Sequence, residues 1–560
     1  MNYKSYIAKY LDIEGVSEEE IMSLVVIPPD NTLGDFALPC FRFAKALRKA
    51  PVIIANELAS SFDKGDVFVE VNAVNGYLNF KVNRGLKTDK VLSSVLTLGE
   101  NYGSSDLGSG KTVCIDYSSI NVAKPFHISH LSTTVIGGAL YKIYKKLGYN
   151  VVGINHLGDY GTQFGKLIYA YKAWGEREAV EQGRVKELMR LYVKYHDEAE
   201  KNPALDDKAR EYFKLIESGD KECNELFKWF KELTLIDVER VYRQLGVTFD
   251  SYAGESFFND KMAPVIDELD KKGLLVESEG AKIVDLSAYD MPPCLILRSD
   301  GASLYATRDL AAAVYRKNTY DFDKCLYVVA YQQNLHFKQF FKVLELMDKP
   351  WAKDMVHVAF GMVSLEEGTM STRKGKVVFL EDVINKCCEK ALSVINEKNP
   401  DLEDKQEIAN AVGVGAVIFG ALSSSRIKDI VFSYDKVLNF DGETGPYCQY
   451  TYARAKSVLR KGGNSTGYLG YQPNDDEYEL ISMLERYPEV LVSASERYEP
   501  SMITRYAVDL SEAYNKFYFN CKILGEEDRV KNFRLALTEA TATVIKNALS
   551  LLGIKTPEKM

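Results

Sequence analysis

The sequence predicts an α/β protein built on a parallel sheet, with an α+β unit before the sheet and a helical region after it. Short apolar segments alternate with helical stretches from residue 111 to about 360, which is typical of parallel strands joined by crossover helices. The first 108 residues mix strand-like and helical patterns, and the chain past residue 405 is mostly helical. We therefore expect three domains, at residues 1–108, 109–404 and 405–560.

The first region carries a helix rich in lysine and arginine at residues 41–49 and strand-like segments at 67–71 and 77–82. Gly and Ser dominate residues 103–110, which indicates a linker. In the central region a helix is expected from Leu131 to Leu147, and the charged helical stretch at about 172–245 indicates an insertion. The apolar strands of this region are expected at 112–117, 151–155, 324–330 and 355–359.

The composition narrows the class of protein. The 560 residues are 46% hydrophobic and 27% charged, with neither a cleavable signal nor an apolar run long enough for a bilayer, so a cytoplasmic location is the default. The net charge of −9 argues against a protein that coats nucleic acid without selectivity, but it allows local basic patches. The nine cysteines include no CxxC pair, which favours reduced thiols over a zinc site or a disulfide framework.

Two histidines, His127 and His130, fall where the first central strand turns into a helix. Unpaired backbone N–H groups and the positive end of the helix dipole attract anions at such a position, and two imidazoles can add hydrogen bonds. The segment is therefore a candidate phosphate site. Residues 105–112 approach a phosphate-binding loop, but they precede a strand and lack its first glycine, so we reject that interpretation.

A second basic element follows at residues 370–376, Met-Ser-Thr-Arg-Lys-Gly-Lys. Alone, such a loop would be interpreted as a solvated basic turn. Together with the histidine pair it suggests adenylyl transfer, with ATP held from two sides and its α-phosphorus open to an attacking carboxylate.

These motifs resemble the class I aminoacyl-tRNA synthetases and, within that class, the arginyl-tRNA synthetase family. His127-Ile-Ser-His130 is similar to the class signature His-Ile-Gly-His, and Met370-Ser-Thr-Arg-Lys-Gly375 to the arginyl form of the Lys-Met-Ser-Lys loop. The resemblance runs nearly end to end. Further blocks that resemble the family, in its order, are Asn121-Val-Ala-Lys-Pro-Phe-His127, Asn155-His-Leu-Gly-Asp-Tyr-Gly-Thr-Gln-Phe-Gly165, Tyr305-Ala-Thr-Arg-Asp309, Gly442-Glu-Thr-Gly-Pro-Tyr447 and the C-terminal residues 551–560.

The resemblance implies a Rossmann-like catalytic domain, an N-terminal domain that touches the tRNA elbow and a helical anticodon-binding domain. It implies arginine contacts through Asn121, Glu255, Tyr305, Asp309 and Gln333. A guanidinium with five donors calls for such carboxylates and acceptors. Without the family, Asp309 would be an ordinary helix-face residue and Glu255 a carboxylate near a helix N-terminus.

For ATP, the resemblance implies that His127 and His130 bind the phosphates and that magnesium accompanies the nucleotide. Arginyl enzymes often lack the second lysine of the mobile loop, and Lys124 can supply that charge. Two departures are Ser129 in place of the usual glycine, which puts the adenine contact in doubt, and Thr369 where many relatives have the first lysine. The loop residues assigned to ATP or catalysis are Met370, Ser371, Arg373 and Lys374.

For tRNA, aromatic and basic residues interleave at 447–456 and suit stacking on unpaired bases, although core packing plus a solvated face would give the same pattern. The anticodon candidates are Tyr447, Gln449, Tyr450 and Arg454, and the elbow candidates are Asn75, Tyr77 and Asn79, which an ordinary strand end explains equally well. The resemblance also implies that the protein is a monomer and that it needs tRNA even for the activation of arginine. His156 and His336 lie in matching blocks, whereas His196 and His357 are expected to be structural.

Two rival functions remain open at this point. The chain could be a class I synthetase for another amino acid, but the Glu255 and Asp309 pair favours a cationic side chain. It could also be a tRNA-binding module that has lost catalysis. In that case we would expect the two histidines and the basic loop to be replaced by other residues. Both motifs are present.

Overall fold

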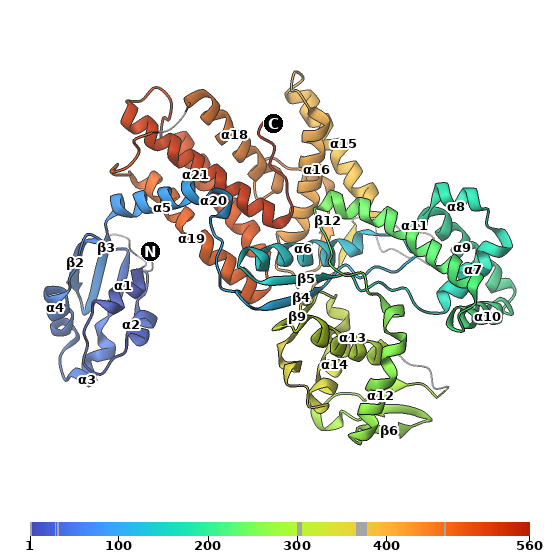
Figure 1. The fold of residues 1–560 in the computed structure, drawn as a ribbon. Coiled ribbons are helices and arrows are strands. Elements are labelled where there is room, and N and C mark those ends of the chain that lie inside the picture. The colour runs from blue at the N-terminus through green and yellow to red at the C-terminus, as the bar shows by residue number, and fades with distance from the viewer. Residues whose placement is uncertain (1–2, 29, 31–32, 300–304, 366–377, 464–465) are drawn as a thin grey trace. The chain divides into compact units, whose positions relative to one another are not determined.

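The computed structural model describes the chain except residues 1–2, 29, 31–32, 300–304, 366–377 and 464–465 (Figure 1). It divides into two compact units. The first comprises residues 1–99, 458–485 and 513–541, and the second residues 100–457, 486–512 and 542–560. Within the described residues, no helix is both long enough and apolar enough to traverse a bilayer. All nine cysteines are buried free thiols, as expected.

The first unit contains an antiparallel sheet in the order β1-β3-β2. Asn75 and Gly76 join β2 to β3 with positive φ values of 50° and 81°, which the two-residue hairpin turn requires. Buried Leu38, Phe68 and Phe80 face the helices. The elements are α1 (Tyr3–Lys9), α2 (Glu18–Leu24), β1 (Phe36–Pro39), η2 (Cys40–Phe43), α3 (Ala44–Leu47), α4 (Pro51–Ser61), β2 (Phe68–Val74), β3 (Tyr77–Val82) and α5 (Arg84–Leu98).

The basic helix expected at residues 41–49 is shorter than predicted. The chain forms one 3-10 turn, η2, and then α3, which ends because Arg48 adopts a left-handed conformation with φ of 51°. Pro51 then begins α4, a position that proline favours because it needs no N–H there.

The second unit is built on a parallel sheet in the order β10-β9-β4-β5, which confirms the predicted fold class. Helices α6 and α13 cover opposite faces of the sheet (Figure 1). The chain goes from β4 to β5 on one side, while β9 and β10 lie on the other, so the connections diverge between β4 and β9. Ligands of open parallel sheets bind at such a divergence, beyond the carboxyl ends of the strands. The elements are β4 (Thr112–Asp116), α6 (Leu131–Lys146), β5 (Asn150–Ile154), α13 (Tyr305–Tyr320), β9 (Lys324–Tyr327), η7 (Tyr331–Gln333), α14 (Asn334–Leu346), η8 (Pro350–Asp354) and β10 (Met355–His357).

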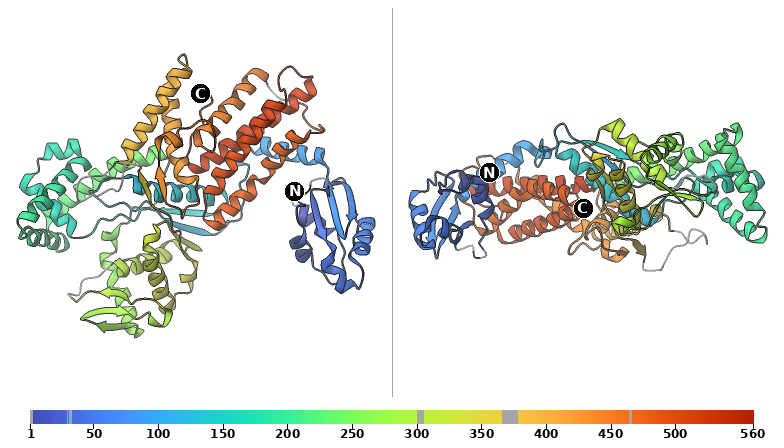
Figure 2. Two further views of the ribbon diagram at one scale, coloured as in Figure 1. Left: turned by 180° about the vertical axis from the view of Figure 1, so that it is seen from behind. Right: turned by 90° about the horizontal axis from the view of Figure 1, so that it is seen from below.

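Two insertions interrupt the alternation of strands and helices. Helices α7–α10 form a cluster beside the sheet domain that α11 joins to it (Figure 2). The second insertion, which the sequence did not reveal, is a small antiparallel sheet in the order β6-β7-β8. The elements are α7 (Thr162–Trp174), α8 (Arg177–Gly183), α9 (Val185–Lys201), α10 (Leu205–Glu217), α11 (Lys221–Leu245), η5 (Glu255–Lys261), α12 (Met262–Lys271), β6 (Leu275–Ser278), β7 (Ala281–Val284), η6 (Ser287–Tyr289) and β8 (Cys294–Leu297).

The rest of the chain is mostly helical, as predicted, apart from the parallel pair β11 and β12. The four last helices each contribute residues to both units. The elements are β11 (Val363–Leu365), α15 (Leu380–Lys398), α16 (Lys405–Leu422), β12 (Ile430–Phe432), α17 (Tyr434–Val437), α18 (Gly445–Gly462), α19 (Asp475–Arg497), α20 (Ser501–Asn520) and α21 (Asp528–Leu552).

Candidate active site

The segment between β4 and α6 has an unusual backbone. Ser118, Ser119 and Ala123 adopt positive φ values of 69°, 44° and 58°, which are uncommon for residues other than glycine. Hydrogen bonds hold this conformation. The Ser118 N–H donates to Thr133 Oγ1 at 3.0 Å, and the Ala123 N–H donates to Thr234 Oγ1 at 3.0 Å. Strained backbone that its surroundings hold in place clusters at functional sites.

The two histidines lie where the sequence predicted, at the turn η4 (Ile128–His130) that leads into α6. Their ring centroids are 3.9 Å apart, and the His127 N–H donates to His130 Nδ1 at 3.2 Å. Since Nδ1 accepts this bond, neutral His130 carries its proton on Nε2 and can donate it to a ligand. His127 Nδ1 is buried and has no hydrogen-bond partner among the described residues.

Both imidazoles are neutral at physiological pH. Burial, followed by the charge of Lys124, lowers the pKa of His127 to about 4. Burial, followed by His127 and Lys124, lowers the pKa of His130 to about 3. In this state the pair offers hydrogen bonds to an anion without a fixed positive charge, and Lys124 supplies the charge.

Lys124 connects the two halves of the predicted site. It lowers the pKa of His127, of His130 and of Glu255, so it lies within electrostatic range of all three. The histidine pair and Glu255 are therefore parts of one region.

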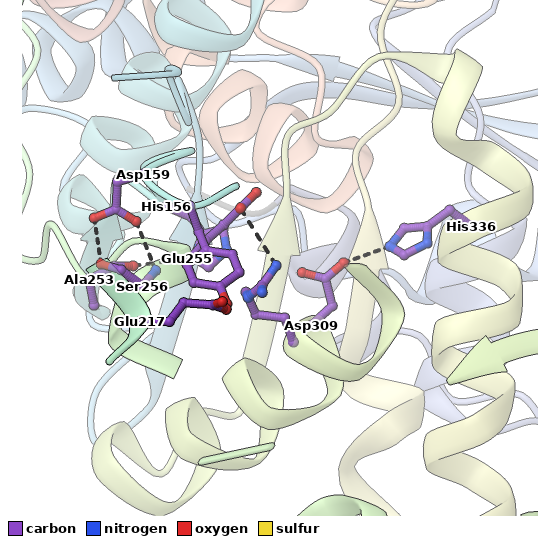
Figure 3. A network of polar contacts seen from close by, with 10 residues as sticks. His156, Asp159, Glu217, Ala253, Glu255, Ser256, Asp309 and His336 are labelled. Atoms are coloured by element: carbon purple, nitrogen blue, oxygen red, sulfur yellow. Dashed lines mark hydrogen bonds and ion pairs between the residues drawn. The ribbon is translucent and has the colours of Figure 1, made fainter. Parts of the chain in front are cut away.

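Glu255 opens η5 and lies against a buried arginine that the sequence analysis did not single out (Figure 3). Its Oε2 lies 3.6 Å from Nη1 of Arg308, and the two side chains are 16% and 5% exposed. Burial raises the pKa of Glu255 to about 7, although the Arg308 guanidinium lowers it.

Asp309 follows Arg308 on α13 and has a different partner. Its Oδ2 lies 2.7 Å from His336 Nε2 (Figure 3). Tyr305 begins α13 and is 68% exposed, and Gln333 is exposed in η7, so both lie at the solvent side of the region.

Asn121 lies against Gly158, which follows β5. The Val122 N–H donates to Gly158 O at 3.1 Å, and a side chain at Gly158 would place its Cβ 2.3 Å from Asn121 Oδ1. Only glycine leaves room for the Asn121 carboxamide in this position.

The basic loop residues Met370, Ser371, Arg373 and Lys374, and Thr369 before them, lie outside the described residues. On the N-terminal side of the segment that contains them, the described chain ends with β11, which pairs with β12. On the other side the Ile128 N–H donates to Val378 O at 3.3 Å and the Leu380 N–H to Phe126 O at 2.9 Å. This antiparallel bridge joins Phe379 to His127.

Asp159 is a further residue that the sequence analysis did not assign. Its fully buried carboxylate accepts hydrogen bonds from the N–H and Oγ of Ser256, each at 2.8 Å (Figure 3). It also accepts a hydrogen bond from Lys231 Nζ at 2.6 Å. These bonds fix the backbone beside Glu255. Asp159 and Arg308 both lie inside blocks that carried the resemblance. They could have been identified by asking which residues neutralise the charges that the fold buries, because buried charges need partners.

Comparisons with known proteins agree with this geometry. Residues 91–434 match the family model of the class I (R) tRNA synthetase catalytic domain, residues 448–560 that of the DALR anticodon binding domain, and residues 1–82 that of the arginyl tRNA synthetase N terminal domain. The arginine–tRNA ligase of Halothermothrix orenii is 53% identical over 98% of both chains. That of Alkaliphilus metalliredigens is 51% identical over the whole of both.

The chain belongs to the arginyl-tRNA synthetase family. The arginyl-tRNA synthetase of Thermus thermophilus is 25% identical, with a TM-score of 0.83 over 100% of this chain and 99% of that one. The arginyl-tRNA synthetase of Plasmodium falciparum, 23% identical, shares the fold with a TM-score of 0.77, over 96% of this chain and 94% of its own.

The predicted anticodon contacts lie in, or directly before, the region matched to the anticodon binding domain, and they have different environments. Tyr450 is 41% exposed, and the Arg454 guanidinium lies 4.9 Å from its ring centroid. Tyr447 is half-buried at the first turn of α18. Gln449 is fully buried, and its amide donates to the carbonyls of Ala411 at 3.0 Å and Lys555 at 2.7 Å. The Gln449 amide therefore forms its hydrogen bonds inside the domain.

In the N-terminal domain of the family, Asn75 and Tyr77 are exposed in and beside the β2–β3 turn. Asn79 is buried within β3. The remaining histidines, expected to be structural, have internal neighbours. His357 stacks on Phe337 with ring centroids 4.2 Å apart, and His196 lies edge-on to Tyr192.

Proposed function

We propose that this arginyl-tRNA synthetase family member is an arginine–tRNA ligase. It joins the carboxylate of L-arginine to the α-phosphate of ATP, releases pyrophosphate, and transfers the arginyl group to the 3′-terminal ribose of tRNA(Arg). The observation that carries this proposal is that Glu255 lies within electrostatic range of Asp309 and of Lys124, and that Lys124 lies within range of both histidines. The full-length identity to arginine–tRNA ligases supports it.

In the activation step, His127 and His130 donate hydrogen bonds to the ATP phosphates and Lys124 adds positive charge. Binding of an anion favours protonation of an imidazole, so charge can increase on the pair as the pyrophosphate leaves. Ser129, between the two histidines, belongs to the same ATP site. We assign Met370, Ser371, Arg373 and Lys374 to ATP binding and catalysis, and Mg²⁺ accompanies the nucleotide.

Arginine is recognised through its side chain. Glu255 and Asp309 accept hydrogen bonds from the guanidinium, because charge-assisted bonds to two carboxylates satisfy its donors. Tyr305 and Gln333 close the pocket from the solvent side, and Asn121 holds the α-amino or carboxyl end.

The tRNA is bound at two places. Tyr447, Tyr450 and Arg454 stack on and pair with anticodon-loop nucleotides, while Asn75 and Tyr77 contact the elbow. Gln449 and Asn79 are both buried, so they support the structure of their domains and do not contact the tRNA themselves. We further propose that tRNA is needed for activation and that the protein acts as a monomer in the cytoplasm.

The decisive experiment is aminoacylation of total tRNA with each of the twenty amino acids supplied separately. Only arginine should be charged, and charging with another amino acid alone would overturn the proposal.

The Asp309→Ala variant tests the site. It should abolish arginine activation and leave tRNA binding intact, because the guanidinium loses one of its two carboxylates. Asp321→Ala is the matched control, since that carboxylate just past α13 is 90% exposed and pairs only at the surface. Undiminished tRNA-dependent pyrophosphate exchange in Asp309→Ala would refute the assignment.

A further inference from the structure

Arg308 is a buried cation with two neighbours. Its side chain is 5% exposed, its guanidinium carbon lies 4.4 Å from the centroid of the Tyr160 ring, and Nη1 lies 3.6 Å from Glu255 Oε2. Its Nε is buried without a hydrogen-bond partner among the described residues. A desolvated guanidinium in such a place is stabilised by a nearby carboxylate and by an aromatic face.

The distance to Glu255 decides what this arginine does. At 3.6 Å the two groups attract each other strongly, but they are too far apart for a hydrogen bond. Glu255 therefore keeps its acceptor lone pairs while it gains the electrostatic support of a neighbouring cation. A substrate guanidinium can then donate hydrogen bonds to this carboxylate without displacing Arg308.

Both partners are held from outside the pair. The Tyr160 ring packs against Arg308, and its hydroxyl donates to Glu217 at the end of α10. Asp159 holds Ser256 through two hydrogen bonds, which fixes the backbone next to Glu255. The 3.6 Å separation is thus imposed by the surrounding structure.

We infer that Arg308 is a positioning residue for substrate recognition, which keeps the Glu255 carboxylate charged and aimed at the guanidinium of arginine. This inference rests on the proposed function. Arg308 acts through Glu255.

The charges around Glu255 indicate how strong this effect is. Burial raises the pKa of Glu255 to about 7; Arg308 lowers it, Asp309 and Asp159 raise it, and Lys124 lowers it. Asp309 is bound in turn by His336 and Asp159 by Lys231. Among the neighbouring charges Arg308 has the largest influence, so its loss leaves Glu255 protonated at neutral pH.

The test measures arginine binding to the full chain by titration calorimetry from about pH 6 to pH 8.5. The substrate guanidinium stays charged throughout, so wild-type affinity should rise as pH passes about 7 and Glu255 ionises. In Arg308→Met the midpoint should move to higher pH. A shift of the pKa of Glu255 by one unit above about 7 lowers its ionised fraction at pH 7 from about one half to about one tenth, which weakens binding by about fivefold. Arg308→Lys, which keeps the charge, should restore a midpoint near that of the wild type.

Two controls separate the outcomes. In Glu255→Gln, the added Arg308→Met change should no longer alter the pH profile, because the titrating group is gone. An Arg308→Met profile parallel to that of the wild type, with an unmoved midpoint, would overturn the inference. If Arg308→Met does not fold, Arg308→Gln provides the same comparison. A wild-type chain that binds no arginine would instead contradict the proposed function.

Discussion

Helix α13 carries two buried arginines, eight residues apart, that meet carboxylates in different ways. Arg316 Nη2 lies 2.6 Å from Asp116 Oδ2, and the other oxygen of Asp116 accepts a hydrogen bond from Ser119 Oγ at 2.7 Å. Both oxygens of Asp116 are therefore engaged. Arg308 stands 3.6 Å from Glu255, whose side chain is more exposed than that of Asp116, 16% against 7%.

The difference distinguishes a structural ion pair from one that serves a ligand. The Arg316–Asp116 pair joins α13 to the end of β4 and uses the acceptor atoms of its carboxylate internally. The Arg308–Glu255 pair provides charge and leaves the acceptors for another donor. The same two kinds of group thus support the fold at one end of the helix and, as we propose, recognition at the other.

The largest expected effect comes from breaking the closed pair. Arg316→Met leaves Asp116 buried without its cation, which should lower the free energy of unfolding by about 3–5 kcal/mol. Urea denaturation would measure this loss. The variant that remains folded should bind arginine with the same pH midpoint as the wild type. A shifted midpoint would show that the Arg316–Asp116 pair also affects arginine recognition.

The next largest effect concerns Lys124, the other cation that lowers the pKa of Glu255. Lys124→Ala should slow adenylate formation by about 10²–10³-fold, because one preorganised charge at the phosphates is lost. The affinity for arginine should change much less, because Arg308 influences Glu255 more. Pyrophosphate exchange and calorimetry would separate the two, with exposed Lys145 as the control position. Equal losses in rate and in arginine affinity would count against the phosphate role.

Glu255→Gln should have an intermediate effect. At pH 8, loss of a charged acceptor should weaken arginine binding by about 1.5–3 kcal/mol. The affinity should also become independent of pH near neutrality, because the pKa values of His127 and His130, about 4 and 3, lie below that range. Calorimetry across that pH range would measure this. If the arginine affinity of the variant still changed near pH 7, a group other than Glu255 would be responsible for the titration.

The smallest effect is expected for Tyr160→Phe. This change removes the hydrogen bond to Glu217 but keeps the ring against Arg308. Stability should fall by about 0.5–1.5 kcal/mol, as thermal unfolding would report, while arginine affinity stays unchanged. A large loss of affinity would mean that the hydroxyl, and not the ring, positions Arg308.

Much of this fold could be predicted from the sequence. The apolar runs at 112–117 and 151–155 correspond to β4 and β5, and the helix expected from Leu131 is α6. Hydrophobic periodicity and turn residues are local signals, so they identified these elements and the histidines at their junction. The antiparallel sheet β6-β7-β8 was missed because its strands are short and mostly half exposed or exposed, which weakens the apolar pattern.

The pairing of charges could not be predicted in this way. Arg308 and Glu255 are 53 residues apart and Arg316 and Asp116 are 200 apart, and no local pattern connects residues at such separations. The burial of Gln449 was likewise hidden, because its partners Ala411 and Lys555 come from distant parts of the chain. The assignments of individual residues to arginine, ATP and tRNA remain predictions.

The bridge between His127 and Phe379 couples two parts of the chain that are 252 residues apart in sequence. The Ile128 N–H donates to Val378 O and the Leu380 N–H donates to Phe126 O, so residues 378–380 hold the main chain on both sides of His127. A displacement of the start of α15 would therefore move the backbone that carries the His127 imidazole.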